Sequence, residues 1–272
     1  MSRGTHAAVV LAGDRGADDP IARTTGAACK ALSPVAGKPL LSRVLTTLRA
    51  APAIETIIVV GPDQATIADQ PALAALLAGD DVRWIAPSAS PAASAARGLA
   101  ALGDRPALLT TADHALLTPA MIDELLAGPA CDLAVGLASY AGVRAAFPDS
   151  RRTAIRLAPG PGYCGCNLFA VHTAAARAVI EDWQRVERER KHPARVIAGM
   201  LGWRAIAAYL LRRLTLEQAF ARLSRRTGLN IRPVILSYPQ AAVDVDTPAD
   251  LALVEAILRE RESDEPTARD IA

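Results

Sequence analysis

Short, unbroken runs of apolar residues separated by helical stretches dominate the first half of the chain. Strands with one solvated face alternate apolar and polar residues, whereas continuous apolar runs are typical of strands covered on both faces of a parallel sheet. The pattern therefore predicts an α/β domain with helices on both faces of the sheet. The predicted strands are 7–11, 56–60, 82–85, 107–110 and 133–136, and the helices between them are 39–51, 65–77, 92–102 and 119–126.

The second half of the chain, from Arg144, has a different sequence pattern. Two extended segments joined by the sequence PGPG predict antiparallel strands added at the sheet edge, and a charged helix follows them. Thr215 and Gln218 form a capping box for a later helix that Gly228 ends, and Thr247 caps a last helix that starts at Pro248. The segments concerned are strands 153–157 and 163–171, helix 174–190, two helices within 194–228, and strand 232–236.

Composition limits both the architecture and the partners. The 272 residues are 51% hydrophobic and 21% charged, which is enough for one domain with a full core. We expect a single domain at 1–262, with 142–229 as added strands and a small α-helical and β insertion, and a flexible tail at 263–272. The 30 basic and 28 acidic residues give no field of one sign, so no nucleic-acid partner is expected.

From the start of the chain we expect a cytoplasmic protein. The first apolar run is short and broken by turn residues, unlike a signal peptide or a membrane-spanning helix. The four cysteines lack the paired spacing of a zinc site and are expected to be reduced thiols. The sequence does not indicate an oligomeric state.

The loop after the first strand is the strongest candidate for chemistry. A strand that ends in a glycine-containing loop exposes successive backbone N–H groups, which form a concave anion site suited to a triphosphate. Arg15 and Lys30 would add positive charge where pyrophosphate departs. Glycines also occur in such turns for packing alone, so this loop is not specific by itself. The candidate nucleotide-binding residues here are Leu11, Ala12, Gly13, Asp14, Arg15, Gly16 and Lys30.

The sequence KALSPVAGKPLL, residues 30–41, supplies the specific signal. It resembles the K-x-L-x-P-V-x-G-K-P-L-L signature of the NTP-transferase superfamily, which includes MobA-like and sugar-1-phosphate nucleotidyltransferases. The resemblance implies a three-layer, Rossmann-like fold of the GT-A type with a mixed, mostly parallel sheet. It also implies transfer of a nucleoside monophosphate from an NTP to a small phosphorylated acceptor, with release of pyrophosphate. In that family the lysine equivalent to Lys30 contacts phosphate.

The loop itself departs from the family pattern, which reads L-A-G-G-x-G-x-R. Asp14 replaces the second glycine, the arginine comes early at position 15, and Cys29 replaces the usual proline. Arg23 is therefore an alternative to Arg15. The altered loop also leaves open a noncatalytic nucleotide-binding regulator derived from the family.

Two aspartates match the metal ligands of the family. The sequence ALLTTADHALLTP resembles its strand that ends in a magnesium-binding aspartate, which would be Asp113. The sequence DVDTPADL resembles its D-T-P-x-D-L element and offers Asp246, with Asp244 as the alternative, while Asp250 fits an ordinary helix N-terminus. Mg²⁺ is the implied cofactor, because it prefers carboxylate and phosphate oxygens. The implied catalytic residues are Lys30, Arg15 and Asp113.

The acceptor side is less well marked. The sequence YCGCNLFAV resembles the family's acceptor-side strand, with Gly165 and Asn167 as candidates, although Asn167 also fits a structural role. Ser90 and Ser94 lie where relatives hold the base and ribose.

The basic segment 194–228 has three interpretations: helices packed on their own domain, a lid that grips the acceptor phosphate with Lys191, or contact with an anionic membrane face or a lipid-pathway enzyme. This segment favours CTP as the nucleotide and a small alcohol phosphate as the acceptor. The second choice is GTP with molybdopterin. A glycosyltransferase of the same fold is the alternative enzyme, but such enzymes usually carry D-x-D where this chain has TADHA.

Overall fold

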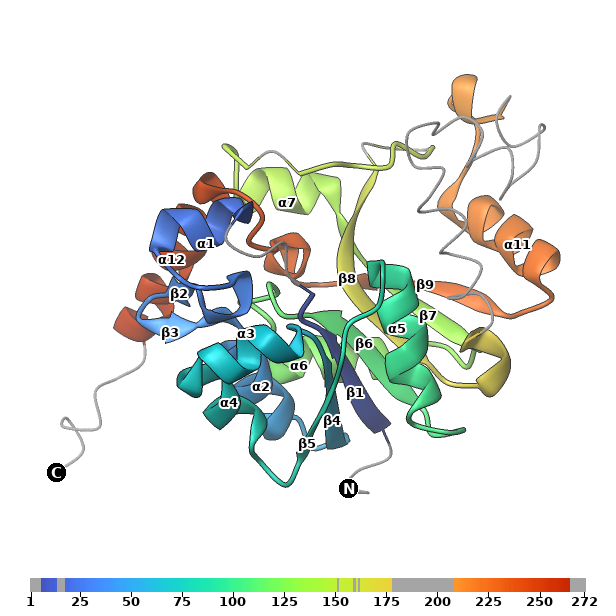
Figure 1. The fold of residues 1–272 in the computed structure, drawn as a ribbon. Coiled ribbons are helices and arrows are strands. Elements are labelled where there is room, and N and C mark those ends of the chain that lie inside the picture. Colours follow the sequence, from blue (N-terminus) through green and yellow to red (C-terminus); the bar gives the residue numbers. More distant parts are fainter. Residues whose placement is uncertain are drawn as a thin grey trace, which may run out of the picture.

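A seven-stranded sheet organises the molecule (Figure 1). The computed structural model describes residues 6–13, 18–150, 152–158, 160, 162–177 and 208–264. All neighbouring strands are parallel except for the pairs made by one strand, β8, so the predicted mixed, mostly parallel sheet is confirmed. In spatial order the strands are β5 (Val82–Ile85), β4 (Ile54–Val60), β1 (His6–Leu11), β6 (Ala107–Thr111), β8 (Tyr163–Val171), β7 (Leu133–Ser139) and β9 (Ile231–Leu236).

The central strand β1 explains the unbroken apolar runs. It pairs in parallel with β4 on one side and β6 on the other, and residues 7 to 10 are completely buried. Successive side chains of a strand point to opposite faces, so a run buried at every position requires a cover on each face. That cover is the reason why the strand reads as apolar throughout.

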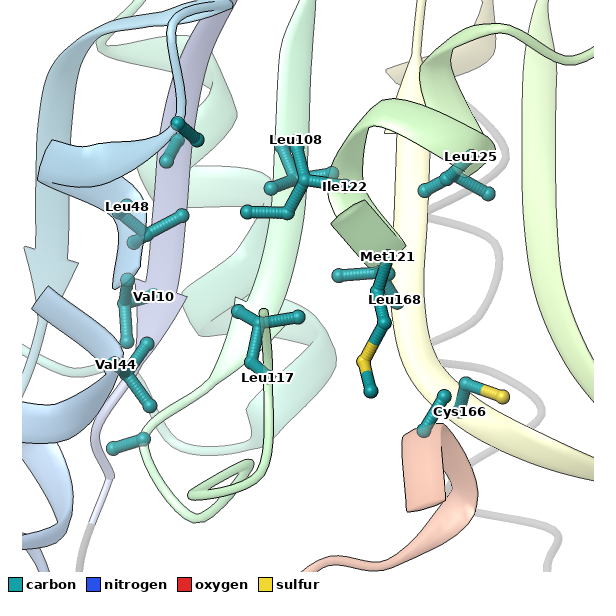
Figure 2. Close-up of a cluster of buried hydrophobic side chains, with 14 of the residues drawn as sticks. Val10, Val44, Leu48, Leu108, Leu117, Met121, Ile122, Leu125, Cys166 and Leu168 are labelled. Carbon is teal, nitrogen blue, oxygen red and sulfur yellow. The ribbon is translucent and has the colours of Figure 1, made fainter. Parts of the chain in front are cut away.

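Helices cover both faces, as predicted. One face is covered by α2 (Leu40–Ala50) and α6 (Pro119–Leu126), whose side chains pack on Val10, Leu108 and Leu168 (Figure 2). The other face carries α5 (Pro91–Ala100) and α11 (Leu216–Thr227), where Leu99 and Phe220 join a separate apolar cluster with Val9 and Ile58. The helix predicted at 65–77 is two helices, α3 (Gln64–Asp69) and α4 (Pro71–Leu77). Pro71 has no backbone N–H to donate to the preceding turn, so α3 ends before it and α4 begins with it.

The prediction of antiparallel strands at the sheet edge is wrong in two respects. β8 lies inside the sheet, antiparallel to both β6 and β7, and β9 forms the edge beside β7. The last residues of β8 are apolar on both faces, which suits an interior strand. Residues 153–157 form no strand and make only an isolated bridge from Ile155 to Tyr163.

The elements at the end of the chain follow the predicted caps. Thr215 and Gln218 form the capping box of α11, and Gly228 ends it in the left-handed conformation with φ 72°. The helix α12 (Pro248–Asp264) continues past 262, so the expected tail from 263 begins inside a helix. A short helix, α7 (Tyr140–Ala146), was not predicted. Of helix 174–190 only 174–177 is described, and 194–207 lies outside the described residues. None of the described helices is long and apolar enough to cross a bilayer.

Gly61 shapes the loop after β4 where it meets the end of β1. Its φ is +90°, and a Cβ there would lie 2.9 Å from the carbonyl oxygen of Ala12. We expect Gly61→Ala to lower the free energy of unfolding by about 3 kcal/mol, because backbone strain adds to the clash. Gly103 is the matched control, since its φ is +57° with open space around it, and Gly103→Ala should cost only about 1 kcal/mol. Urea denaturation measures both, and equal losses would contradict the close-approach argument.

Candidate functional site

Three segments far apart in the sequence meet at the carboxyl end of the central strands. The loop after β6 carries Asp113, and the turn after the short helix η3 (Pro239–Ala242) carries Asp244 and Asp246. The backbone N–H of Val245 donates to the carbonyl of Asp113 at 3.1 Å, which ties the turn to the loop. An apolar cluster holds α12 against α1 (Pro20–Thr25) beneath them, with buried members Ile21, Val35, Leu40, Ala115, Leu116, Val243, Val245, Leu251, Val254 and Leu258.

The third segment presents Lys30. Asp19 caps α1 by accepting from the backbone N–H of Ile21 at 2.9 Å, and Gly26 ends the helix with φ 68°. The chain then turns into the short helix η2 (Lys30–Leu32). The helix α1 was not predicted, although an aspartate before a proline and a glycine six residues after that proline are the signals of a short capped helix.

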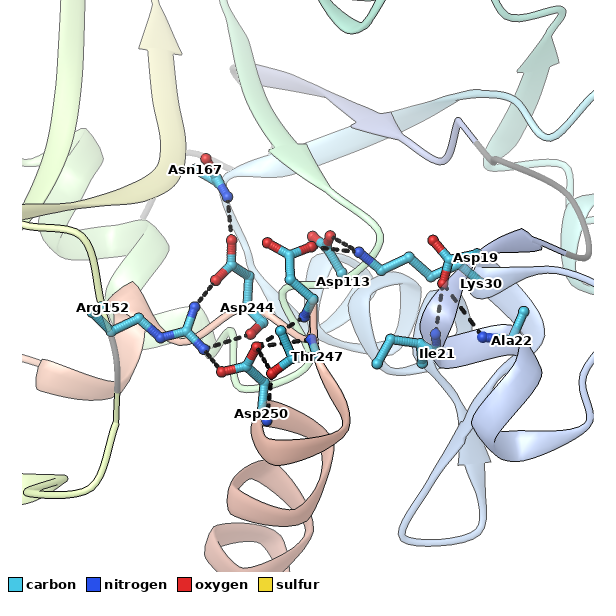
Figure 3. A network of polar contacts seen from close by, with 11 residues as sticks. Asp19, Ile21, Ala22, Lys30, Asp113, Arg152, Asn167, Asp244, Thr247 and Asp250 are labelled. Atoms are coloured by element: carbon cyan, nitrogen blue, oxygen red, sulfur yellow. Dashed lines mark hydrogen bonds and ion pairs between the residues drawn. The ribbon is translucent and has the colours of Figure 1, made fainter.

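Lys30 lies between the two predicted metal ligands. Its Nζ is 2.5 Å from Oδ2 of Asp113 and 2.8 Å from Oδ1 of Asp246, and its contact with Asp113 is drawn in Figure 3. Burial opposes the charge of the ammonium, but the two carboxylates outweigh burial and raise the pKa of Lys30 above its ordinary value. The predicted convergence of Lys30, Asp113 and Asp246 is therefore the geometry of the folded chain.

The donor atoms at this point suit a hard divalent cation. Oδ1 of Asp113 is buried and has no hydrogen-bond partner among the described residues, so it is available as a ligand. Asp246 is 60% exposed at its side chain and supplies a second carboxylate. Within the described residues, no group of three or more His, Cys, Asp or Glu could hold a metal ion. Mg²⁺ tolerates such a site, because it keeps several waters and takes oxygen ligands from substrate phosphates.

Beside this group lies an arginine that the sequence analysis missed. The guanidinium of Arg152 pairs with the carboxylates of Asp244 and Asp250, and it donates to the carbonyl of Asp244 at 2.8 Å (Figure 3). Asn167 donates to the other oxygen of Asp244 at 2.8 Å, from a backbone with φ 47° that asparagine tolerates. Burial, followed by the charges of Asp113 and Asp246, raises the pKa of Asp244 to about 6. Asp244 is thus held by Arg152 and Asn167, which favours Asp246 as the second metal ligand.

A cleft of about 1070 Å³ opens next to these carboxylates. Gly165 and Asn167 line it together with Arg152 and Asp246, and the role of the first two in acceptor binding stays a prediction. Apolar side chains such as Phe147 form another part of its wall. The cleft therefore extends from the carboxylates into a space large enough for a small-molecule acceptor.

The remaining predicted residues are placed as follows. Leu11 ends β1, and Ala12 continues toward Gly13 with its N–H donated to the carbonyl of Val60 at 2.9 Å. The hydroxyl of Ser90 caps α5, and that of Ser94 accepts from the N–H of Ser88 at 2.9 Å, so both have structural partners and their contact with nucleotide stays a prediction. Four predicted residues lie outside the described part of the chain, namely Asp14, Arg15, Gly16 and Lys191.

His114, next to Asp113, makes the stability of the domain depend on pH. Desolvation of the completely buried ring lowers its pKa to about 4, below the 6.5 of the unfolded chain. At His114 the unfolded state then binds more protons than the folded state between pH 6.5 and 4, so this residue should lower the free energy of unfolding by about 3 kcal/mol across this window. The raised pKa of Asp244 acts in the opposite direction but is common to wild type and a His114 variant, so the effect of His114 is the difference between the two proteins. Metal-free wild type and His114→Leu can be compared by denaturation at both pH values. An equal decrease in the variant would contradict this role of His114.

Known proteins resemble this chain in sequence and in fold. The MobA-like NTP transferase domain model matches residues 8–228. A hypothetical transferase from Thermus thermophilus is 28% identical, with a TM-score of 0.73, and the match covers 92% of this chain and 100% of that one. No curated protein matches the chain.

Two further structures share the fold. The 4-diphosphocytidyl-2C-methyl-D-erythritol synthase of Anaerococcus prevotii is 15% identical with a TM-score of 0.57, covering 94% of this chain and 96% of that one. A CMP:2-keto-3-deoxy-manno-octonic acid synthetase in complex with CTP is 17% identical with a TM-score of 0.58, covering 96% and 100%. The family model matches most of the chain, and the signature lysine lies beside two aspartates. The chain therefore belongs to the MobA-like NTP transferase family of nucleotidyltransferases.

Proposed function

We propose that this nucleotidyltransferase moves a nucleoside monophosphate from an NTP, preferentially CTP, to a small phosphorylated acceptor and releases pyrophosphate. The observation that carries the proposal is the meeting of Lys30, Asp113 and Asp246 near the end of β1, where the N–H of Ala112 donates to the carbonyl of Leu11 at 2.9 Å. The loop that follows β1 is the predicted phosphate site, and the cleft beside the carboxylates offers room for an acceptor.

Asp113 and Asp246 are the residues that would hold Mg²⁺. When bound, the ion supplies Lewis-acid stabilisation of the charge that develops on the phosphates. Lys30 adds a fixed positive charge at the same place and would stabilise the departing pyrophosphate. The unpartnered oxygen of Asp113 supports this assignment, because a buried carboxylate oxygen with no partner is costly unless a ligand satisfies it.

An acceptor phosphate is already an anionic nucleophile at neutral pH, so the proposed reaction requires no general base. Catalysis would then come from positioning the acceptor in line with the α-phosphate and from charge neutralisation. Gly165 and Asn167 are the proposed acceptor-binding residues on the wall of the cleft. The backbone at Gly165 is open, because a Cβ there would meet no atom within 4 Å.

The preference for CTP rests on the basic segment 194–228, which suits an alcohol phosphate that is later built into a lipid headgroup. CTP is also the nucleotide in the synthetase structure described above. Leu210 and Leu211, exposed among the described residues, precede Arg212 and Arg213, and such a pairing suits the face of an anionic membrane. We therefore include peripheral contact with the cytoplasmic membrane face in the proposal. Co-sedimentation with vesicles of phosphatidylcholine, with and without phosphatidylglycerol, tests it, and equal binding to both would exclude an electrostatic contribution.

The decisive experiment measures pyrophosphate release from each of four NTPs with a panel of sugar, polyol and cofactor phosphates. The proposal expects release with CTP that depends on both Mg²⁺ and an alcohol phosphate. Turnover of nucleotide sugars without pyrophosphate would indicate the glycosyltransferase alternative. Nucleotide binding without any turnover would indicate a noncatalytic regulator.

A further inference from the structure

Arg152 holds both ends of the turn that carries Asp246. Its guanidinium contacts the carboxylate and the carbonyl of Asp244 at one end and the carboxylate of Asp250 at the other. The arginine comes from the segment between α7 and β8, which lines the same cleft as the turn, and its side chain is only 10% exposed. A planar guanidinium can bond two carboxylates at once in a fixed geometry, which an ammonium cannot reproduce.

Other contacts also hold the turn: the N–H of Val245 donates to the carbonyl of Asp113 at 3.1 Å, and Asn167 donates to Asp244 at 2.8 Å. The second carboxylate oxygen of Asp250 accepts from the N–H of Asp246 at 3.3 Å and from the N–H of Thr247 at 2.9 Å. The carboxylate of Asp246 itself is more than half exposed, and Lys30 is its side-chain partner in the described structure. Since Lys30 approaches from another segment, the backbone of the turn decides where Asp246 points.

The charges at the turn make the arginine more than a packing element. Asp113, Asp244, Asp246 and Asp250 gather here with two cations, Lys30 and Arg152. Removal of one partner from a buried, hydrogen-bonded charge pair leaves the other charge uncompensated. Without Arg152, Asp244 and Asp250 would repel each other and the turn would lose its shape.

We propose that Arg152 is a positioning residue for the metal site, and that it sets the carboxylate of Asp246 opposite Asp113 by clamping Asp244 and Asp250. The inference rests on the proposed function, because it assumes that Asp246 binds Mg²⁺. Arg152 also lines the acceptor cleft, so the clamp joins the wall of that cleft to the metal ligand. It acts through its carboxylate partners and contacts neither the metal nor the nucleotide.

The test measures the affinity of the full chain for Mn²⁺ by electron paramagnetic resonance, with α,β-methylene-CTP present. Arg152→Met should weaken Mn²⁺ binding about tenfold or more, as is typical when a group that orients a metal ligand is lost. Arg152→Lys keeps the positive charge but cannot bond two carboxylates in the fixed geometry of a guanidinium, so it should lose less Mn²⁺ affinity than Arg152→Met. The control is Arg156→Met, an exposed arginine of the same segment, which should bind Mn²⁺ like wild type.

Asp246→Asn separates failure of this inference from failure of the proposed function. If Asp246→Asn and wild type bind Mn²⁺ equally, the metal assignment is wrong. If Asp246→Asn loses affinity while both Arg152 variants keep it, only the clamp is overturned. Thermal unfolding identifies any variant that does not fold, and Arg152→Lys then carries the test, because the charge that it retains should preserve the fold. If a folded Arg152→Lys protein binds Mn²⁺ as tightly as wild type and Arg156→Met do, the clamp is overturned.

Discussion

Asp113→Asn should reduce the rate of pyrophosphate release by about 10³-fold or more. Metal stabilisation of the transition state is worth several kcal/mol, and about 4 kcal/mol corresponds to a thousandfold in rate. Asparagine has nearly the same shape but no charge, so the variant removes a ligand charge without opening a cavity. Single-turnover measurement of pyrophosphate at saturating NTP checks the chemical step directly.

The control for this variant is Asp123→Asn, an exposed aspartate on α6 with no side-chain partner in the described structure. It should keep the wild-type rate. The ammonium of Lys30 loses a charged neighbour in Asp113→Asn, so thermal unfolding must accompany the kinetics to show that the domain is intact. A folded Asp113→Asn protein with a rate within tenfold of wild type would end the proposed mechanism.

The sheet was predictable to the extent that local sequence determines it. Strands buried on both faces are apolar at every position. The five strands predicted in the first half have bounds within a few residues of those of β1, β4, β5, β6 and β7. The location of β8 was not predictable in this way. Whether β8 pairs at the edge or between β6 and β7 is decided by contacts with residues far along the chain, and its own sequence suits either.

The site divides in the same manner. Lys30, Asp113 and Asp246 belong to recognisable motifs, so the resemblance to the family predicts that they lie together. Arg152 stands in a segment without a motif or periodicity, and its partners Asp244 and Asp250 lie 92 and 98 residues away. Only the fold reveals such a contact. The helix α1 is a different case, since Asp19, Pro20 and Gly26 already signal it.

Lys30→Met should lower the turnover number by about 10²- to 10³-fold, because a preorganised positive charge at a developing anion is worth roughly 3 kcal/mol. A second effect of opposite sign is expected on metal binding. The ammonium lies within 2.8 Å of both carboxylates, where it would compete with a divalent cation for the same oxygens. With the ammonium removed, Mn²⁺ alone, without nucleotide, should bind more tightly than it does to wild type.

This pair of effects distinguishes a catalytic lysine from a merely structural one. If Lys30 only stabilised the fold by neutralising Asp113 and Asp246, Mn²⁺ could replace it in that role, and added Mn²⁺ should restore both the thermal stability and the turnover of Lys30→Met. If it shares the metal's ligands, added Mn²⁺ should restore the thermal stability of Lys30→Met while turnover stays low. Lys38→Met, an exposed lysine eight residues away, should change none of these quantities. Weaker Mn²⁺ binding by a folded Lys30→Met protein would contradict competition, and a wild-type turnover number would remove Lys30 from catalysis.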